Sequence, residues 1–491
     1  MDERTVIRGG AVLAGDPGKG HVEPADVLIE RGRIAAIAPG VDAGDARVLD
    51  ARGTLVVPGF VDTHRHTWQT AMRGVCADWT LLDYFRGIRL QISGAYDAQD
   101  VYAGNLVGAL EALGCGVTTV LDFSHCIHTP EHADAAIRGL REAGLRGTFA
   151  YGMFPAPSER TSFATPDDRL ADARRVRGEH FAADGLLGMG VALTELGLVP
   201  FEQTRAEVEL ARELDVLVTA HTGTVWNARR PPEVELLHAA GLLDHRQVHV
   251  HCNACSNREL DLLAAAGAAV SVTPETELAM GMGFPIIERA IARGMLPSFG
   301  CDIVSNNRGD LFTQMRLGLQ AERARRNAED HARDAMPAHL DLTVRDALRF
   351  ATLGGAEALG LGSVCGSLEV GKAGDVLLVR TDGLHGAPMH DPVAWLVLQA
   401  GPGDVDTVLV GGRIVKRGGE LTGVDVPALR RLVEDTRDRV VAELAPRGGL
   451  LPPEPDGWFE LTLQVMDAHL AGAPRPGDGG DGNEATSRRD V

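Results

Sequence analysis

Histidine and aspartate close four apolar runs of the chain, and these residue types bind divalent metals. His64 and His66 end the first run two residues apart, and in an extended chain such residues point the same way. His221, His251 and Asp302 end three later runs. Imidazole and carboxylate groups suit Zn²⁺, with Fe²⁺ as the alternative. A metal bound by them would lower the pKa of its water from about 15.7 towards about 7 and supply hydroxide at neutral pH.

Any one of these histidines has an ordinary explanation, because the chain contains 17 and a single histidine is more often a surface or hydrogen-bonded residue. Their joint placement outweighs that explanation. A His-x-His pair is followed, in order, by two histidines and an aspartate at later strand ends. The sequence therefore predicts a metal site.

The residues of this site need strands whose ends meet at one edge. From about residue 58 to residue 362, short apolar runs alternate with longer helical patterns, which often close on a glycine. Eight such units predict an α/β fold, a (β/α)8 TIM barrel, in which catalytic groups sit at the C-terminal ends of the strands. The expected strands are residues 56–64, 117–123, 147–153, 186–193, 215–221, 247–251, 268–273 and 296–302.

The two ends of the chain have a different pattern. Residues 1–57 and 363–422 contain short β-branched runs closed by glycine or charged turns, and they predict one small β-sandwich domain built from both ends. Residues 58–362 are the expected barrel domain, and residues 423–472 a helical extension. Residues 473–491 are rich in Gly, Pro and Asp, and we expect them to form a disordered tail.

Composition and charge narrow the classes of protein and partner. With 491 residues, of which 44% are hydrophobic and 24% charged, the chain can build a sizeable core, which excludes a wholly disordered protein. The 48 basic and 68 acidic residues give a net charge of −20 at pH 7. Because such a surface repels phosphate backbones, we expect a small-molecule substrate and no nucleic-acid polymer as partner.

Location and assembly are also expected from the sequence. The N-terminus has no basic stretch followed by an apolar run, so no signal peptide is expected, and no apolar run approaches the ~20 residues needed to span a membrane. The seven cysteines are scattered and odd in number, which is typical of reduced thiols. We expect a cytoplasmic protein without membrane partners, and a homo-oligomer because of the extra C-terminal helices.

Five segments of the chain are specific enough to compare with known families. They are VVPGFVDTHRHTWQTAMRG (56–74), VTAHTG (218–223), VHVHC (248–252), FGCD (299–302) and GSLEVGKAGDVLLV (366–379). Together they resemble the amidohydrolase superfamily and, within it, the branch of cytosine/guanine deaminases and triazine hydrolases. The resemblance runs from about residue 5 to residue 420.

This resemblance implies a ligand set and roles for its members. One divalent metal would be held by His64, His66, His221 and Asp302. Asp302 would take a proton from the metal-bound water, while His251 would polarise the substrate or orient the hydroxide. Many relatives bridge two ions with a carboxylated lysine from a barrel strand. The three lysines of this chain all lie in the predicted sandwich, which excludes such a bridged pair.

Besides His251, three residues are candidates for contact with a substrate. Gln69 completes His-x-His-x-x-Gln, a pattern similar to that of guanine-type deaminases, in which glutamine would bond the substrate ring; a surface glutamine opening a helix is the equal alternative. Trp79 lies in a long loop of the kind that covers pockets, where it would stack on a flat ring or simply pack against the barrel. Thr224 follows His221 at the position where deaminases of this branch usually carry glutamate.

Thr224 bears on the reaction itself. Threonine cannot carry a proton near neutral pH, so a deaminase built on this chain would need another acid. Glu195, after the fourth strand, and Glu275, after the seventh, are the candidates.

The sequence thus predicts a metal-dependent hydrolase, with one metal, that acts on a C–N bond of a small heterocyclic molecule. Deamination, with attack by metal hydroxide and release of ammonia, is the leading hypothesis. The alternative is an amide, urea or carbamate hydrolase, or a triazine-type hydrolase that displaces chloride or an alkylamine. A non-catalytic barrel that keeps its metal is disfavoured because all four expected ligands are present.

Overall fold

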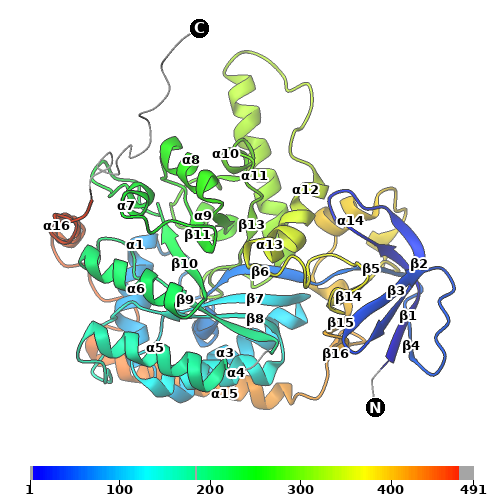
Figure 1. Ribbon diagram of the computed structural model, residues 1–491, viewed down its shortest axis with the longest axis horizontal. Coiled ribbons are helices and arrows are strands. Elements are labelled where there is room, and N and C mark those ends of the chain that lie inside the picture. The colour runs from blue at the N-terminus through cyan, green and yellow to red at the C-terminus, as the bar shows by residue number, and fades with distance from the viewer. Residues whose placement is uncertain (1–3, 183–184, 475–491) are drawn as a thin grey trace, which may run out of the picture.

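Eight parallel strands form the predicted barrel in a computed structural model of the chain, which describes residues 4–182 and 185–474 (Figure 1). Each strand pairs with the next in sequence order. A bridge between Arg65 and Asp302 brings the ends of the first and last strands together. The strands are β6 (Phe60–Arg65), β7 (Val117–Ser124), β8 (Arg146–Gly152), β9 (Leu187–Ala192), β10 (Leu217–Thr222), β11 (Gln247–His251), β12 (Ala269–Val272) and β13 (Ser298–Phe299).

The strands read as unbroken apolar runs because both of their faces are covered. Every residue of β6, β7 and β8 is buried, between the side chains that fill the barrel and the helices outside it. The expected strand 296–302 is only the two residues of β13, and the expected strand 56–64 also differs from the structure. It is two strands separated at Gly59, since β5 (Thr54–Pro58) pairs with the other sheet and only β6 enters the barrel.

Helices and turns connect the strands and lie outside the barrel (Figure 1). A 3₁₀ turn over Thr67–Met72 and a π-helical segment over Phe85–Ile92 belong to the long first loop. The helices are α1 (Leu81–Tyr84), α2 (Ser93–Ala95), α3 (Ala98–Gly114), α4 (Pro130–Ala143), α5 (Pro166–His180), α6 (Phe201–Glu213), α7 (Glu233–Ala239), α8 (Asn257–Ala266), α9 (Pro274–Ala279), α10 (Ile287–Ile291), α11 (Leu311–His331), α12 (Val344–Arg349), α13 (Gly355–Ala358) and α14 (Pro392–Leu398).

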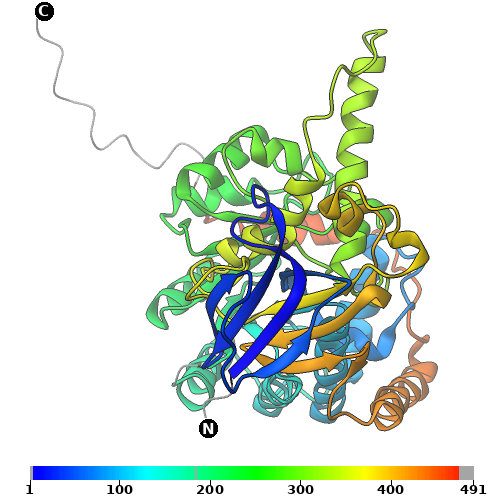
Figure 2. The same ribbon diagram turned by 90° about the vertical axis from the view of Figure 1, so that its right-hand side faces the viewer.

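A second sheet joins the two ends of the chain, as predicted. Figure 2 faces it and shows blue N-terminal strands beside yellow and orange strands from the far end. Ile7, Val27 and Val56 share one buried cluster with Val376 and Leu409, so neither end completes this core alone. The strand order is β17-β16-β15-β14-β5-β1-β2-β3, with β4 beside β1. The remaining strands are β1 (Arg4–Leu13), β2 (Val22–Glu30), β3 (Arg33–Ala38), β4 (Arg47–Asp50), β14 (Val376–Arg380), β15 (Val405–Val410), β16 (Arg413–Arg417) and β17 (Glu420–Leu421).

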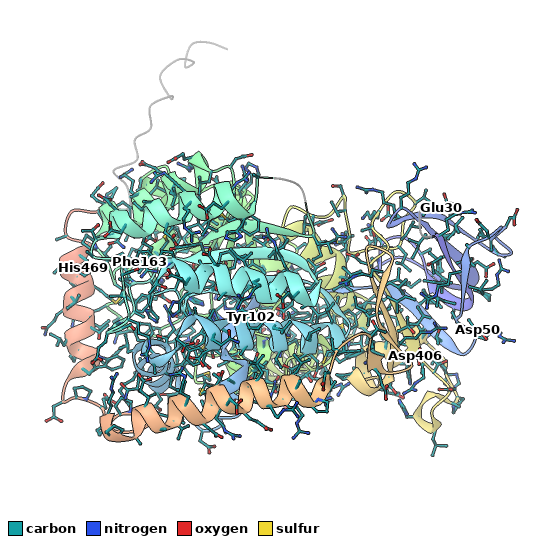
Figure 3. The ribbon with its side chains drawn as sticks, turned by 90° about the horizontal axis from the view of Figure 1, so that it is seen from below. Glu30, Asp50, Tyr102, Phe163, Asp406 and His469 are labelled. Carbon is teal, nitrogen blue, oxygen red and sulfur yellow. The ribbon has the colours of Figure 1, made fainter. Side chains whose placement is uncertain are left out.

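Two further helices follow the second sheet. In Figure 3, α15 (Val426–Leu444) runs along the lower edge of the view, while α16 (Trp458–His469) lies at the end of the molecule opposite the sheet that carries Glu30 and Asp50. Of the tail expected over 473–491, residues 475–491 lie outside the described part of the chain. No helix within the described residues is long and apolar enough to cross a membrane.

The seam between the first and last strands is tightly packed. The N–H of Asp302 donates to the carbonyl of His64 at 2.8 Å, and the N–H of His66 donates to the carbonyl of Asp302 at 2.8 Å. Beneath the seam, fully buried Arg65 donates through Nε to Asp62 at 2.8 Å, so its role is structural. Gly300 completes the packing, because a Cβ there would lie 2.7 Å from Cβ of His64.

We expect Gly300→Ala to lower the free energy of unfolding by about 3 kcal/mol, because the new methyl group would also meet backbone atoms of His64 that cannot move aside. Urea unfolding measures this. Gly114→Ala is the matched control, since nothing lies within 4 Å of its position at the end of α3. It should be neutral or stabilise by up to about 1 kcal/mol. Equal stability of the two variants would contradict the close approach at the seam.

Candidate active site

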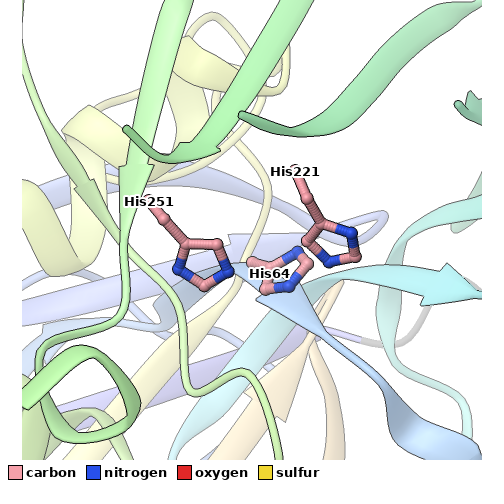
Figure 4. A group of neighbouring side chains, drawn as sticks. All are labelled: His64, His221 and His251. Carbon is pink, nitrogen blue, oxygen red and sulfur yellow. The ribbon is translucent and has the colours of Figure 1, made fainter. Parts of the chain in front are cut away.

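The five residues predicted for the metal site meet at the C-terminal ends of the barrel strands. His64 lies in β6 with His66 just beyond it, His221 lies in β10, His251 ends β11, and Asp302 follows β13. Figure 4 shows the rings of His64, His221 and His251 turned towards one another. The centroid of the His64 ring lies 4.7 Å from that of His66, 5.1 Å from that of His221 and 5.5 Å from that of His251.

Their donor atoms converge on a common space. Oδ1 of Asp302 lies 3.2 Å from Nε2 of His64 and 3.4 Å from Nε2 of His66. Nε2 of His66 lies 3.3 Å from Nε2 of His221. Two overlapping groups therefore have ligand atoms within 4.8 Å of one another: His64 with His66 and Asp302, and His64 with His221 and His251.

The surroundings of His64 suit a cation. Its side chain is completely buried, yet neither ring nitrogen makes a hydrogen bond. A buried polar group without a partner is costly, and metal coordination removes that cost. Imidazole and carboxylate donors in this arrangement fit a divalent ion of the zinc or iron type.

Burial also sets the protonation states that such an ion needs. It lowers the pKa of His64, holds that of His66 well below its usual range and brings that of His221 to about 4, so these rings are neutral at pH 7. Burial opposes ionisation of Asp302, but contact with His64 and the nearby histidines holds its pKa well below the usual range. The cluster thus combines neutral imidazoles with an ionised carboxylate, the forms that bind metals.

The far nitrogens of three rings are held by other groups. Nδ1 of His66 lies 2.9 Å from the carbonyl of Phe123, and Nδ1 of His221 lies 2.9 Å from Oε1 of Glu195. Nδ1 of His251 lies 3.1 Å from Oγ1 of Thr273. Hydrogen bonds at Nδ1 fix each ring and leave Nε2 to face the centre.

The backbone is strained at two of the five positions. His251 has a φ of 74° and Asp302 a φ of 62°, in the left-handed region that non-glycine residues seldom adopt. Such strain persists where the surrounding structure enforces it, often at functional sites. Here it turns each side chain at a strand end towards the centre.

A cavity of about 1060 Å³, counting the part open to solvent, lies over the cluster. His66, His221, His251 and Asp302 form its polar end. Met280 and Met282, just beyond α9, also line the cavity. Further apolar side chains come from the barrel loops, among them Leu81, Phe85 and Leu196. The helix α16, which the sequence did not connect with the site, adds Trp458, Phe459, Leu463 and Met466.

The two expected acids are not placed to donate a proton. Glu195 lines the cavity, but Nη1 of Arg89 lies 2.5 Å from its Oε1, and Arg89 with His221 holds its pKa well below the usual range despite burial. It is an ionised anchor for His221. Glu275 accepts a hydrogen bond from Gln314 at 3.0 Å and lies outside the cavity lining. Both expectations are therefore corrected.

Of Thr224, Gln69 and Trp79, which we expected to contact a substrate, only Thr224 lies in the cavity lining. Gln69 is completely buried and does not: its amide donates to the Tyr84 hydroxyl at 2.7 Å and accepts from Ser305 at 2.7 Å. Tyr84 lines the cavity, so Gln69 orients a phenol of the cavity wall. The alternative that Gln69 is a surface glutamine is wrong. Trp79 also lies outside the lining, because its ring packs on Gly87.

Glu233 and Arg230 are cavity residues that sequence reasoning missed. Glu233 is the first residue of α7, twelve positions beyond His221, after a Pro-Pro pair. Burial raises its pKa to about 7, opposed by Arg230 and by a hydrogen bond from the N–H of Gly223. The signal available in the sequence was a glutamate opening a helix directly after the His221 loop.

A family model and the sequences of known proteins relate this chain to the same family. The profile of the Amidohydrolase family matches residues 55–415. The chain is 30% identical to 5'-deoxyadenosine deaminase of Methanothermobacter thermautotrophicus, over 84% of this chain and 94% of that one. It is 32% identical to 5-methylthioadenosine/S-adenosylhomocysteine deaminase of Symbiobacterium thermophilum, over 90% of this chain and 100% of that one.

Solved structures agree. An adenosine deaminase from Xanthomonas campestris with bound zinc superposes with a TM-score of 0.78, at 26% identity, over 89% of this chain and 98% of that chain. Triazine hydrolase from Arthrobacter aurescens superposes with a TM-score of 0.76, at 22% identity, over 89% of this chain and 99% of that chain, a likeness of fold.

We expect Glu195→Gln to lower the free energy of unfolding of chelator-treated protein by about 2 kcal/mol or more, because it leaves the buried Arg89 guanidinium without a counter-charge. Urea unfolding at pH 7 measures this. Glu275→Gln is the control, since its carboxyl, with a pKa of about 7, loses less charge in the same substitution. Equal losses in the two variants would show that Arg89 does not depend on Glu195.

Proposed function

The chain belongs to the amidohydrolase family and is a hydrolase of carbon–nitrogen bonds, and from this premise we propose that it deaminates an adenosine-type nucleoside that carries an apolar group at its 5' position. The relatives described above are deaminases of 5'-deoxyadenosine and of 5-methylthioadenosine or S-adenosylhomocysteine. One observation carries the proposal: a cluster of buried histidines and an ionised aspartate, in which neither ring nitrogen of His64 makes a hydrogen bond, opens onto a largely apolar cavity.

We further propose one Zn²⁺ as the metal, held by His64, His66, His221 and Asp302. The zinc in the similar adenosine deaminase and the unpartnered nitrogens of His64 support this choice. The barrel segment carries no lysine that could bridge a second ion. When bound, such an ion lowers the pKa of a water and polarises the group under attack.

The residues of the chain have separate tasks in this reaction. Asp302, ionised and facing the cavity, takes a proton from the attacking water and passes it to the ring nitrogen beside the attacked carbon. Nδ1 of His251 lies 3.1 Å from Thr273 and 3.4 Å from Glu277. When Nδ1 carries the ring proton, Nε2 is an acceptor, which orients the water rather than polarising the substrate.

Product analysis by mass spectrometry tests the reaction class. Zinc-reconstituted protein is offered adenosine-type nucleosides, other aminopurines, s-triazines and aryl ureas. Exchange of an amino group for oxygen on the purine, with ammonia in equal amount, supports the proposal. Release of chloride or an alkylamine from a triazine, or cleavage of a urea, without purine deamination, would place the enzyme in the alternative class.

The cavity predicts a ranking of nucleosides. We expect kcat/KM for 5'-deoxyadenosine and 5'-methylthioadenosine to exceed that for adenosine 5'-monophosphate by about 10-fold or more, because an apolar wall gives a phosphate no partner. The arginines beside this wall are already paired, Arg89 with Glu195 and Arg230 with Glu259. Initial rates of ammonia release measure the ranking, and a preference for the monophosphate would overturn it.

The ligand assignment predicts a contrast between two buried histidines. We expect His66→Ala to bind far less zinc than wild-type protein and to lose about 10³-fold or more in kcat/KM. His249→Ala is the control, because that ring lies in the same barrel, bonded to Thr222 and Gln247 outside the cluster. It should keep its zinc. Metal analysis and ammonia release measure both, and zinc retained by His66→Ala would refute the assignment.

A further inference from the structure

We propose that Glu233 is the proton donor of the reaction and gives its proton to the departing amine, the task for which Thr224 is unsuited. This inference rests on the proposed deaminase function. Within the described part of the chain, three carboxyl groups line the cavity: Glu195, Glu233 and Asp302. Glu195 is paired with Arg89 and Asp302 belongs to the histidine cluster. Glu233 alone remains to carry a proton.

Glu233 is anchored to the loop that carries His221. Its Oε2 accepts a hydrogen bond of 2.6 Å from the N–H of Gly223, two residues beyond His221. Gly223 has a φ of 57°, and a Cβ there would lie 2.6 Å from Sγ of Cys255, so this turn requires glycine. The sharp turn directs the N–H at Glu233 and thereby places its carboxyl on the wall of the cavity.

The other oxygen of Glu233 is the one available to a substrate. Oε1 lies 3.9 Å from Nη1 of Arg230, beyond hydrogen-bonding distance. With Oε2 occupied by the N–H of Gly223, the proton of the neutral acid belongs on Oε1. Because Glu233 lines the cavity, we assign this O–H as the group that reaches the substrate.

The charges around Glu233 leave that proton in place near neutral pH. Arg230 faces it, but the Arg230 guanidinium is bonded to Glu259 of α8 at 2.5 and 3.2 Å. Glu259 and Glu195 add negative charge that disfavours a second carboxylate. Burial is the largest influence, and it outweighs Arg230 and the Gly223 N–H to raise the pKa of Glu233 to about 7.

Other buried carboxyls share this pKa but lie elsewhere. Burial raises the pKa of Glu207 and that of Glu275 to about 7. Glu207 is bonded to Thr194 and Glu275 to Gln314, and neither belongs to the cavity lining. What distinguishes Glu233 is its position, and Glu275 offers a control of the same chemistry.

Protons and electrons balance in the proposed deamination. Oxygen of water adds to the ring carbon that bears the amine, one water proton passes through Asp302 to the adjacent ring nitrogen, and the amine takes the proton of Glu233. The C–N bond then breaks and its electron pair leaves with ammonia. The hydroxyl left on carbon becomes a carbonyl, and its proton restores Glu233. The sum is substrate plus water giving the oxo product and ammonia.

Glu233→Gln tests the role, because glutamine keeps an acceptor for the Gly223 N–H and carries no acidic proton. We expect kcat/KM for the amino substrate to fall by about 10²-fold or more, while Glu275→Gln stays within about 2-fold of wild type. Zinc content and melting temperature are measured on both variants to confirm that each site is intact. A Glu233→Gln enzyme within about 3-fold of wild type would overturn the proposal.

A halogenated analogue separates proton donation from positioning. Chloride leaves without a proton, so the 6-chloropurine counterpart of the substrate should lose less than about 10-fold in Glu233→Gln. Equal loss on the amino and chloro substrates would overturn the proposal, because it would show that Glu233 only positions the loop after His221.

Two pH-dependent readouts complete the test. Glu233 must be protonated, so wild-type kcat/KM should fall as pH rises through about 7, and Glu233→Gln should lack that decline. Independently of turnover, infrared spectra at pH 6 should show a protonated carboxyl band that Glu233→Gln lacks and Glu275→Gln keeps. Absence of that band would overturn the inference. Failure of wild type to deaminate any nucleoside would instead refute the proposed function.

Discussion

Four imidazoles and one carboxylate share a largely buried space at the ends of the barrel strands, and the rest of the site is arranged to hold them there. Burial keeps the rings of His64, His66 and His221 neutral. Contacts at Nδ1 of His66, His221 and His251 leave Nε2 directed inward. The strained backbone at His251 and Asp302 aims two of the five side chains. Without a cation at the centre, His64 keeps a buried ring whose nitrogens make no hydrogen bonds.

Burial acts on the three cavity carboxyls in the same direction, yet they end in different protonation states. Contact with His64 and the nearby histidines keeps Asp302 ionised. Contact with Arg89 and His221 keeps Glu195 ionised. Glu233 faces an arginine that Glu259 already neutralises, so the penalty of burial prevails. Separating the pKa values of neighbouring acids is how one cavity holds both a base and an acid at neutral pH.

The sequence predicted the barrel and its cluster well because both obey short-range rules. A strand has a period of two, so His64 and His66 share a face, and parallel strands bring His221, His251 and Asp302 to the same edge. Contacts between residues far apart in the chain could not be predicted from the sequence. The hydrogen-bond partners of Gln69 lie 15 and 236 residues away in the sequence. Glu233 reaches the cavity because its carboxyl accepts a hydrogen bond from the turn at Gly223, and no sequence periodicity indicates that contact.

Part of the apolar wall of the cavity comes from a distant part of the chain. Trp458, Phe459, Leu463 and Met466 of α16 complete the cavity, although more than 150 residues separate them from Asp302 in the sequence. In the sequence this stretch reads as an amphipathic helix beyond the domain that carries the chemistry. Because α16 contributes to the cavity without supplying any of the cluster, changes in its apolar side chains alter which molecule fits while leaving the reacting groups in place. Part of the cavity wall is thus supplied by a segment that carries none of the predicted metal ligands.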